Sequence, residues 1–287
     1  MNSPNKKVLI AGYTGFIGAH LMKKLGLNKF ITIIPISRSN GFNLTSNPKI
    51  FDIECDVIVN LSGVVGIERS WEEPGIFYKD NYLTTLNLLE LARKNDASIV
   101  HISSYVYGVP EYLPVDEKHP VQSYNPYASS KILSEDLCKD YGRNFNIPVT
   151  ILRPFNIYGT NQPTKFLISE LVNSAINGNN VDIYDMNAKR DYLWVEDLVN
   201  GITKVVNNQK TGVNIYNIGS GVSHSAKEIV DIINAKNSNL NYSIVGRDNS
   251  LLVKDCICDY SLFTYDFKWR PKITLEEGIS RMINHLS

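Results

Sequence analysis

Residues 6–25 read KKVLIAGYTGFIGAHLMKKL, and this stretch decides the fold. A short apolar run at Val8–Ala11 leads into a turn with three glycines, which is followed by a helical pattern over Ala19–Leu25. Gly12 permits a tight turn, Gly15 lets the backbone approach a pyrophosphate, and Gly18 lets helix and strand pack closely. The first N–H groups of the helix then face the phosphates. A strand before the glycines and a helix after them predict a dinucleotide-binding turn.

The alternation of apolar runs and amphipathic stretches continues along the first half of the chain. Strands are expected at Ile31–Ile36, Asp56–Leu61, Ile99–Ser103 and Val149–Arg153, and helices at Tyr82–Arg93 and Ser129–Gly142. This order implies right-handed βαβ units and a parallel sheet covered on both faces. After about residue 160 the rhythm weakens, although Phe166–Asn177 and Ala226–Ala235 are still helix-like.

These patterns predict an α/β protein with a Rossmann-type doubly wound parallel sheet and a smaller C-terminal substrate-binding lobe. We expect the dinucleotide-binding domain to span residues 1–160, with a returning segment near residues 190–218. The substrate-binding lobe is expected mainly at residues 161–287.

Composition excludes several classes of protein. The chain has 287 residues, 43% of them hydrophobic, which is too apolar for a disordered segment. Its 29 basic and 29 acidic residues give no net charge, so no field favours a nucleic-acid partner. No apolar stretch approaches the roughly 20 residues that span a bilayer. We expect a soluble cytoplasmic protein with neither a nucleic-acid nor a membrane partner.

The cysteines do not suggest a metal. Two of the four form a C-x-C pair, and no second pair has the spacing of a zinc site. We expect four reduced thiols and no metal, with the cysteines at Cys55, Cys138, Cys256 and Cys258.

A tyrosine and a lysine stand four residues apart in the segment YASSK, which begins at Tyr127. On a helix this spacing places the phenol of Tyr127 and the ammonium of Lys131 on one face. A neighbouring cation stabilises a phenolate and lowers its pKa from a usual value of ~10. The pair therefore predicts that Tyr127 exchanges protons at neutral pH.

Upstream lies HISSYVYG at residues 101–108, an expected strand that ends in two serines. With the glycine turn and the Tyr–Lys pair, it resembles the extended short-chain dehydrogenase/reductase family of NAD(P)-dependent epimerases and dehydratases. The resemblance continues in order through DVIVNLSG at 56–63, RPFNIYG at 153–159, RDYLWVED at 190–197, YNIG at 216–219 and WRP at 269–271. It implies that Ser103, Tyr127 and Lys131 are catalytic. Ser103 would hold the reacting oxygen, and its neighbour Ser104 is the alternative.

The end of the second expected strand predicts the cofactor. NAD-specific sites place an acid there to bond the ribose 2′-hydroxyl, but no acid occurs from Lys29 to Phe51. Ser37 can bond a 2′-phosphate and Arg38 can pair with it. We expect NADP(H), with NAD(H) as the alternative. Residues expected at the cofactor are Gly12, Thr14, Gly15, Phe16, Ile17, Gly18, Ser37, Arg38, Asn43, Leu44, Leu61, Ser62, Gly63, Tyr127, Lys131 and Pro154.

The resemblance also implies a substrate, a nucleotide-diphosphate sugar. Asn156 and Ser104 would face it, and Arg190 would bind its diphosphate, for which a guanidinium offers a planar fork of donors. Arg247 is a weaker second candidate for the diphosphate. The resemblance further implies a homodimer formed through the helices around Tyr82–Arg93 and Ser129–Gly142.

The reaction is predicted by exclusion within the family. Its dehydratases carry an acid pair straight after the serine, where this chain has Ser104 and Tyr105. Its GDP-fucose-forming enzymes use a Cys and a His, where Tyr105 and Lys165 stand. We therefore expect an NADPH-dependent reductase of the C4 ketone of a nucleotide-linked 4-keto-6-deoxy sugar, serving surface-polysaccharide biosynthesis. The alternatives are an NAD-dependent nucleotide-sugar 4-epimerase and a non-catalytic NADP-sensing protein.

Overall fold

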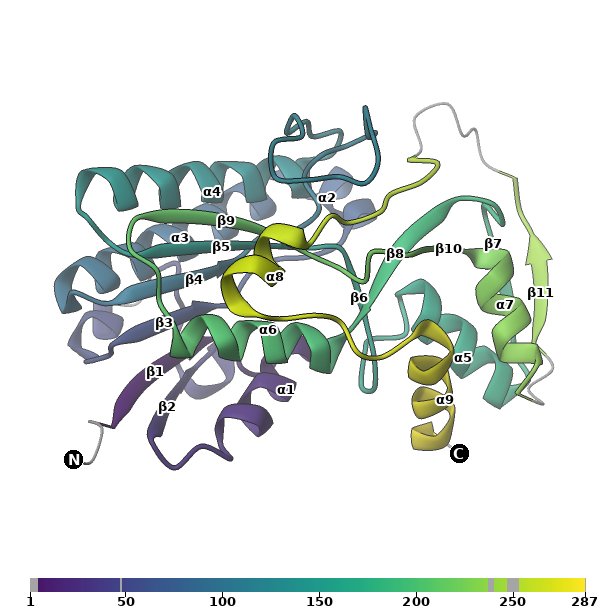
Figure 1. The fold of residues 1–287 in the computed structure, drawn as a ribbon, viewed down its shortest axis with the longest axis horizontal. Coiled ribbons are helices and arrows are strands. Elements are labelled where there is room, and N and C mark those ends of the chain that lie inside the picture. Colours follow the sequence, from purple (N-terminus) through teal and green to yellow (C-terminus); the bar gives the residue numbers. More distant parts are fainter. Residues whose placement is uncertain (1–4, 47, 237–239, 247–252, 287) are drawn as a thin grey trace. The chain divides into compact units, whose positions relative to one another are not determined.

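The structure is a computed structural model that describes residues 5–46, 48–236, 240–246 and 253–286 (Figure 1). The chain divides into two compact units. Unit 1 comprises Met1–Val106, Val121–Pro154 and Val199–Tyr216, and unit 2 comprises Tyr107–Pro120, Phe155–Leu198 and Asn217–Ser287.

Unit 1 is built on a six-stranded sheet with the order β2-β1-β3-β4-β5-β9. Its strands are β1 (Lys6–Ala11), β2 (Ile31–Ile36), β3 (Val57–Asn60), β4 (Ser98–Ile102), β5 (Val149–Pro154) and β9 (Val213–Ile218). The pairings from β2 to β5 are all parallel. Because β2 and β3 lie on opposite sides of β1, the strand order reverses there, and such a point is where open α/β sheets bind ligands. The predicted Rossmann-type α/β fold is confirmed.

Helices cover both faces of this sheet, as Figure 1 shows: α3 (Pro74–Asn95) and α4 (Pro126–Asn144) on one, α1 (Phe16–Leu25) and α6 (Val195–Asn207) on the other. A short helix, α2 (Ile67–Glu72), precedes α3. The core beneath α3 and α4 is fully buried and apolar, and it includes Leu9, Ile58, Leu88, Leu89, Ile99, Cys138 and Val149.

Helices α3 and α4 begin earlier than their apolar periodicity predicts. Each starts with a proline, at Pro74 and Pro126, whose fixed φ and missing N–H suit the first helical position. Asn125 caps α4 by accepting a hydrogen bond from the N–H of Ala128 at 2.8 Å. This cap fixes the first turn of the helix that carries Tyr127 and Lys131.

Unit 2 contains two small sheets and four helices among its described residues. The sheets are β10-β8-β6 and β11-β7, from β6 (Asn156–Tyr158), β7 (Asn180–Ile183), β8 (Lys189–Trp194), β10 (Ser223–Ser225) and β11 (Asn241–Ile244). The helices are α5 (Leu167–Asn177), α7 (Ala226–Asn234), α8 (Ser261–Phe267) and α9 (Leu275–Leu286). Apolar faces of α5, α7 and α9 meet in one core that includes Ile168, Leu171, Val172, Ile229, Ile233 and Ile279.

The two aspartates of the RDYLWVED segment have a structural role in unit 2. Asp191 is fully buried and accepts hydrogen bonds from the N–H groups of Ser220, Gly221 and Cys258 at 2.7–3.0 Å. The carboxylate of Asp197 accepts from two consecutive N–H groups, those of Lys272 and Ile273. Each side chain thereby ties distant loops to β8 or to the start of α6.

Candidate functional site

The glycine turn joins β1 to α1, and its geometry explains each glycine. Gly12 has a φ of +83°, which favours glycine, and a Cβ there would lie 2.9 Å from the backbone of Leu61 and Ser62. A Cβ on Gly18 would lie 2.3 Å from the carbonyl oxygen of Gly12. Gly15 is less restricted, since its Cβ would meet only that same oxygen, at 3.3 Å. Packing therefore requires a glycine at Gly12 and Gly18, whereas a Cβ at Gly15 would make one close contact.

The N-terminus of α1 is suited to an anion. Gly15 is its N-cap residue and offers no side-chain hydrogen bond to the first turn, in which Phe16, Ile17 and Gly18 lie. Unpaired N–H groups at a helix N-terminus attract phosphate. The turn thus fits the pyrophosphate of a dinucleotide, and Thr14 lies within it.

At the carboxyl end of β2, Arg38 pairs with a carboxylate from a distant helix. Its Nη2 lies 2.6 Å from Oδ2 of Asp80 on α3. The neighbouring Ser37 shares a 2.6 Å hydrogen bond with Ser39, and its N–H donates to Asn40 at 2.8 Å. Asp80 lies 42 residues beyond Arg38, outside the strand-end pattern, so the sequence did not predict this ion pair.

The other residues expected on the adenine side lie after β2. Asn43 accepts hydrogen bonds from the N–H and the hydroxyl of Thr45, so its side chain closes a local turn. Leu44 is buried, and its carbonyl accepts from Asn87 of α3 at 2.6 Å. These contacts hold Asn43 and Leu44 in place after the carboxyl end of β2.

The loop after β3, Leu61–Gly63, is held from α3. Asn81 accepts a hydrogen bond from the N–H of Val64 at 2.7 Å and donates to the carbonyl of Val64 and to the hydroxyl of Ser130 on α4. A Cβ on Gly63 would lie 2.9 Å from Oδ1 of Asn81. The amide of Asn81 therefore connects the loop, α3 and α4, a role that the sequence analysis did not assign.

Tyr127 and Lys131 lie on α4 as predicted, but their electrostatics differ from the prediction. The phenol of Tyr127 shares a side-chain hydrogen bond with Ser104, and burial raises its pKa while this hydrogen bond opposes the rise. Lys131 donates to the carbonyl of Ile102 at 2.6 Å, and burial lowers its pKa to about 8. The expected lowering of the Tyr127 pKa by Lys131 was wrong for the protein alone, because desolvation outweighs the other contributions.

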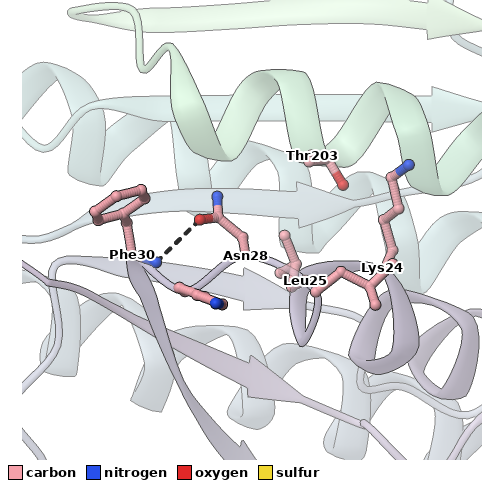
Figure 2. A pocket seen from close by; sticks show the side chains of 7 residues that line it. Lys24, Leu25, Asn28, Phe30 and Thr203 are labelled. Atoms are coloured by element: carbon pink, nitrogen blue, oxygen red, sulfur yellow. Dashed lines mark hydrogen bonds between the residues drawn. The ribbon is translucent and has the colours of Figure 1, made fainter.

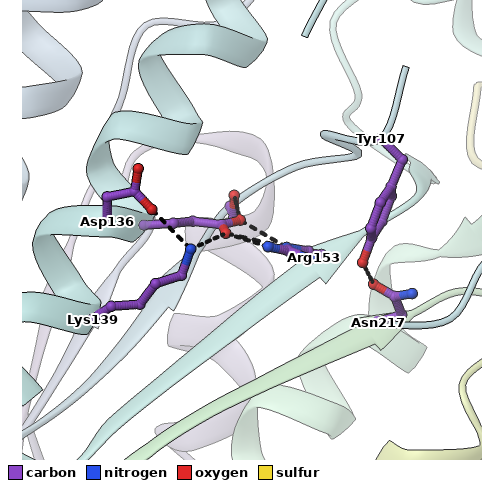
Figure 3. Close-up of polar contacts among 7 residues, drawn as sticks. Tyr107, Asp136, Lys139, Arg153 and Asn217 are labelled. Atoms are coloured by element: carbon purple, nitrogen blue, oxygen red, sulfur yellow. Dashed lines mark hydrogen bonds and ion pairs between the residues drawn. The ribbon is translucent and has the colours of Figure 1, made fainter. Parts of the chain in front are cut away.

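The two serines at the end of β4 have different partners. The hydroxyl of Ser103 donates to Oε1 of Glu135 at 2.6 Å, whereas Ser104 contacts Tyr127. Glu135 is fully buried and pairs with Arg153, with Nη2 and Oε2 2.6 Å apart. Figure 3 shows Arg153 in this group with Lys139, whose Nζ lies 3.8 Å from Oε2 of Glu135.

This arrangement departs from the expectation that Ser103 holds the reacting oxygen. Ser103 and Ser104 both follow β4, which ends at Ile102, and one of these two adjacent serines contacts Tyr127. In the structure that serine is Ser104. Glu135 and Arg153 were missed, although Glu135 follows Lys131 by four residues on the same helix.

In unit 2, the expected substrate residues are held by backbone contacts. Asn156 donates to the carbonyl of Asp191 at 3.1 Å, and Nη1 of Arg190 donates to the carbonyls of Lys189 and Val253. Within the residues that the structure describes, Arg190 has no carboxylate partner. Arg247 lies outside the described residues.

Two further sequence features have structural explanations. The hydroxyl of Tyr107, from the HISSYVYG segment, donates to Asn217 at 2.5 Å within unit 2 (Figure 3). Pro154 is the last residue of β5 and is buried. The Tyr107 hydroxyl is therefore used within the fold, and Pro154 has no polar side-chain group to offer a ligand.

A surface pocket of about 450 Å³ lies away from these residues, between the end of α1, the start of β2 and Thr203 of α6 (Figure 2). Its lining consists of Lys24, Leu25, Leu27, Asn28, Lys29, Phe30 and Thr203. The pocket lies at the amino end of β2, whereas Ser37 and Arg38 follow its carboxyl end. This pocket is therefore separate from the candidate site.

The described residues contain no group of three or more His, Cys, Asp or Glu placed to hold a metal ion. All four cysteines are buried and unbonded, and burial raises the pKa of the Cys55 thiol to about 12. No helix in the described ranges is long and apolar enough to cross a membrane.

Comparison with known proteins gives a family match. Residues 8–219 match the family described as "NAD dependent epimerase/dehydratase family". A protein of Methanocaldococcus jannaschii, described as "Putative UDP-glucose 4-epimerase", is 32% identical over 306 residues, covering 96% of this chain and 97% of the relative. The GDP-6-deoxy-D-mannose reductase of Pseudomonas aeruginosa is 26% identical and covers 79% of each chain.

A solved structure gives the same fold. The structure of RMD from Pseudomonas aeruginosa complexed with NADPH superposes with a TM-score of 0.89 over 97% of this chain and 98% of that one, at 24% identity.

Proposed function

Because the chain belongs to the NAD dependent epimerase/dehydratase family, we propose that it is an NADPH-dependent reductase of the C4 ketone of a nucleotide-linked 4-keto-6-deoxy sugar. The observation that carries the proposal is the end of β2, where Ser37 and Arg38 stand and no acid follows as far as Phe51. Such an end suits the 2′-phosphate of NADPH, a cofactor that transfers hydride. The relative named GDP-6-deoxy-D-mannose reductase supports this reaction class.

In this proposal, unit 1 binds the cofactor and unit 2 much of the substrate. The cofactor would contact the glycine turn, the end of β2, the Asn43–Leu44 step and the loop Leu61–Gly63, all of which lie at carboxyl ends of parallel strands or just beyond them. When bound, NADPH supplies the hydride that the ketone carbon accepts.

Tyr127 would donate its proton to the ketone oxygen as that oxygen gains negative charge. A phenol whose pKa is raised by burial is fully protonated at neutral pH, which suits a proton donor. Ser104 would donate a hydrogen bond to the same oxygen, because its hydroxyl lies beside the phenol. Lys131 would bond the ribose next to the nicotinamide, and its positive charge would favour loss of the Tyr127 proton.

On the substrate side, we infer that Arg190 pairs with the diphosphate and that Asn156 faces the sugar. The guanidinium of Arg190 keeps donors beyond those used on Lys189 and Val253, since five N–H groups are available to it. Arg247 stays a prediction for the diphosphate. We also expect a homodimer through α3 and α4, where Tyr78, Tyr82 and Leu133 are exposed.

A second candidate is a nucleotide-sugar 4-epimerase that retains NAD. It is favoured by the 32% identical relative, whose name is that of an epimerase. It is disfavoured by the segment after β2, which lacks the acidic residue that NAD-specific sites place there. An epimerase oxidises C4 and reduces it again, so it neither consumes NADPH nor releases its cofactor.

The test is a panel of freshly generated nucleotide-linked 4-keto-6-deoxy sugars mixed with NADPH and the purified protein. A reductase oxidises NADPH in proportion to product, and the fastest panel member identifies base and sugar. Tyr127→Phe is expected to abolish this turnover while NADPH binding survives. Absence of oxidation across the panel, with NAD released on denaturation and UDP-glucose converted to UDP-galactose, would establish the epimerase instead.

A further inference from the structure

The ion pair between Arg38 and Asp80 joins two elements of unit 1 at the end of β2. Arg38 begins a short 3-10 helix, Arg38–Asn40, and its side chain is 68% exposed. Asp80 is only 17% exposed and lies in the first half of α3. The carboxylate is therefore the fixed partner, and the guanidinium is the one free to turn.

The backbone around Arg38 is also fixed. Ser37 and Asn40 form a capping box across the turn, in which Asn40 Oδ1 accepts from the N–H of Ser37 at 2.8 Å. Asn40 also donates to the carbonyl of Pro35 at 2.8 Å. Any rearrangement that frees the guanidinium must therefore take place in the Arg38 side chain alone.

We propose that Asp80 sets the cofactor preference of this protein by holding Arg38, the cation that we expect to pair with a 2′-phosphate. This inference rests on the proposed function, since it concerns the same NADP(H) site. A bound 2′-phosphate must either displace Asp80 from Arg38 or share the guanidinium with it. If the two share it, the negatively charged phosphate lies close to the negatively charged carboxylate and is repelled by it. The uncharged 2′-hydroxyl of NADH neither competes for Arg38 nor is repelled by Asp80. Asp80 thus weakens NADPH binding relative to NADH, although the segment after β2 itself carries no acid.

The expected size of the effect follows from exposure. Arg38 is mostly solvent-exposed, and charges in such a setting interact weakly and are screened by salt. Loss of the carboxylate should therefore tighten NADPH binding by on the order of three- to tenfold, and it should change NADH binding less than about twofold.

The experiment measures dissociation constants of NADPH and NADH by calorimetry for the wild type, Asp80→Asn and Asp80→Ser. We expect both Asp80 variants to raise the NADPH:NADH affinity ratio three- to tenfold at low salt, and the gain to shrink at about 0.5 M salt. In an Arg38→Ala background the same Asp80 change should give a clearly smaller gain, because only the repulsion between the carboxylate and the 2′-phosphate is then removed.

A matched control is Glu54→Gln. Glu54 forms an ion pair of similar length with Lys7, at 2.8 Å, and precedes β3, at the end of the sheet where the parallel strands begin. Its loss changes the net charge equally but should leave the affinity ratio unchanged.

Three results would overturn the inference. An unchanged ratio in the Asp80 variants would show that Asp80 does not act on the cofactor, while the proposed function stands. A loss of NADH affinity in Asp80→Asn would make Asp80 a ribose acceptor, which is the opposite role. Failure of the wild type to bind either dinucleotide would remove both this inference and the proposed function.

Discussion

The hydroxyl of Ser103 donates to Glu135 at 2.6 Å, which leaves the adjacent Ser104 as the serine that contacts Tyr127. The two serines should therefore respond differently to substitution. Ser104→Ala should lower kcat by ~10²–10³-fold, as loss of a donor to a developing oxyanion commonly does. Ser103→Ala should keep kcat within about threefold and lower the free energy of unfolding by about 1–2 kcal/mol, because a hydrogen bond to a buried charge is lost. Steady-state kinetics and urea unfolding of both variants check this, and the reverse pattern would return the catalytic role to Ser103.

The lowered pKa of Lys131 should make the free energy of unfolding depend on pH. Its pKa is lowered to about 8 in the folded protein, from 10.5. Between these values the unfolded chain binds more protons at this site than the folded protein does, so stability rises with pH there. Below pH 8 the burial penalty on the charged lysine is fully present. Lys131→Met should therefore be more stable than the wild type at pH 7, and this advantage should narrow toward pH 10. Thermal unfolding at both pH values measures it, and a constant difference would contradict the assignment.

The pair of Glu135 and Arg153 is expected to be sensitive to removal of one partner. Both side chains are almost fully buried, and Arg153 contacts Glu135 through Nε at 2.9 Å as well as through Nη2. Glu135→Gln leaves an uncompensated buried guanidinium, a change that typically costs about 3–5 kcal/mol. Urea unfolding should show this loss with an unchanged slope, whereas Asp136→Asn, on the exposed side of the same helix, should stay within about 0.5 kcal/mol. A loss below about 1 kcal/mol for Glu135→Gln would argue against the pair's contribution.

Two glycines of the turn offer a further contrast. A Cβ at Gly18 would overlap the Gly12 carbonyl, so Gly18→Ala should destabilise the fold by about 1–3 kcal/mol. Gly15 has an ordinary φ of −72°, and its Cβ would meet only the carbonyl oxygen of Gly12, at 3.3 Å, a close contact that a small shift relieves. Gly15→Ala should therefore fold within about 1 kcal/mol of the wild type and weaken dinucleotide binding at least tenfold, because the methyl group stands where we propose the phosphates approach. Equal dinucleotide affinity for Gly15→Ala and the wild type would place the phosphates elsewhere.

The parts of the site that the sequence predicted are those encoded locally. The glycine turn follows from spacing within seven residues, and the shared helix face of Tyr127 and Lys131 follows from a spacing of four. Strand ends could also be located closely: the strands expected to end at Ile36 and Leu61 end at Ile36 and Asn60. In a parallel sheet, the carboxyl ends of the strands then meet at one edge.

The parts that it missed depend on tertiary packing. Asp80 reaches Arg38 only because the fold brings the first half of α3 to the end of β2, and no pattern within either segment indicates this contact. Glu135 and Arg153 meet across the space between α4 and β5. The choice between Ser103 and Ser104 depends on the path of the chain after β4, which ends at Ile102, and on the partners that Glu135 and Tyr127 offer from α4.

Asn81 has a consequence for local opening of the protein. Its amide hydrogen-bonds both backbone groups of Val64 and the hydroxyl of Ser130, so one side chain of α3 holds the loop after β3 and the first turns of α4. The loop cannot separate from α3 without breaking contacts that α4 shares. Amide hydrogen exchange at Val64 is therefore expected to follow the opening of a cooperative unit that includes the start of α4, rather than the independent fluctuation of a surface loop.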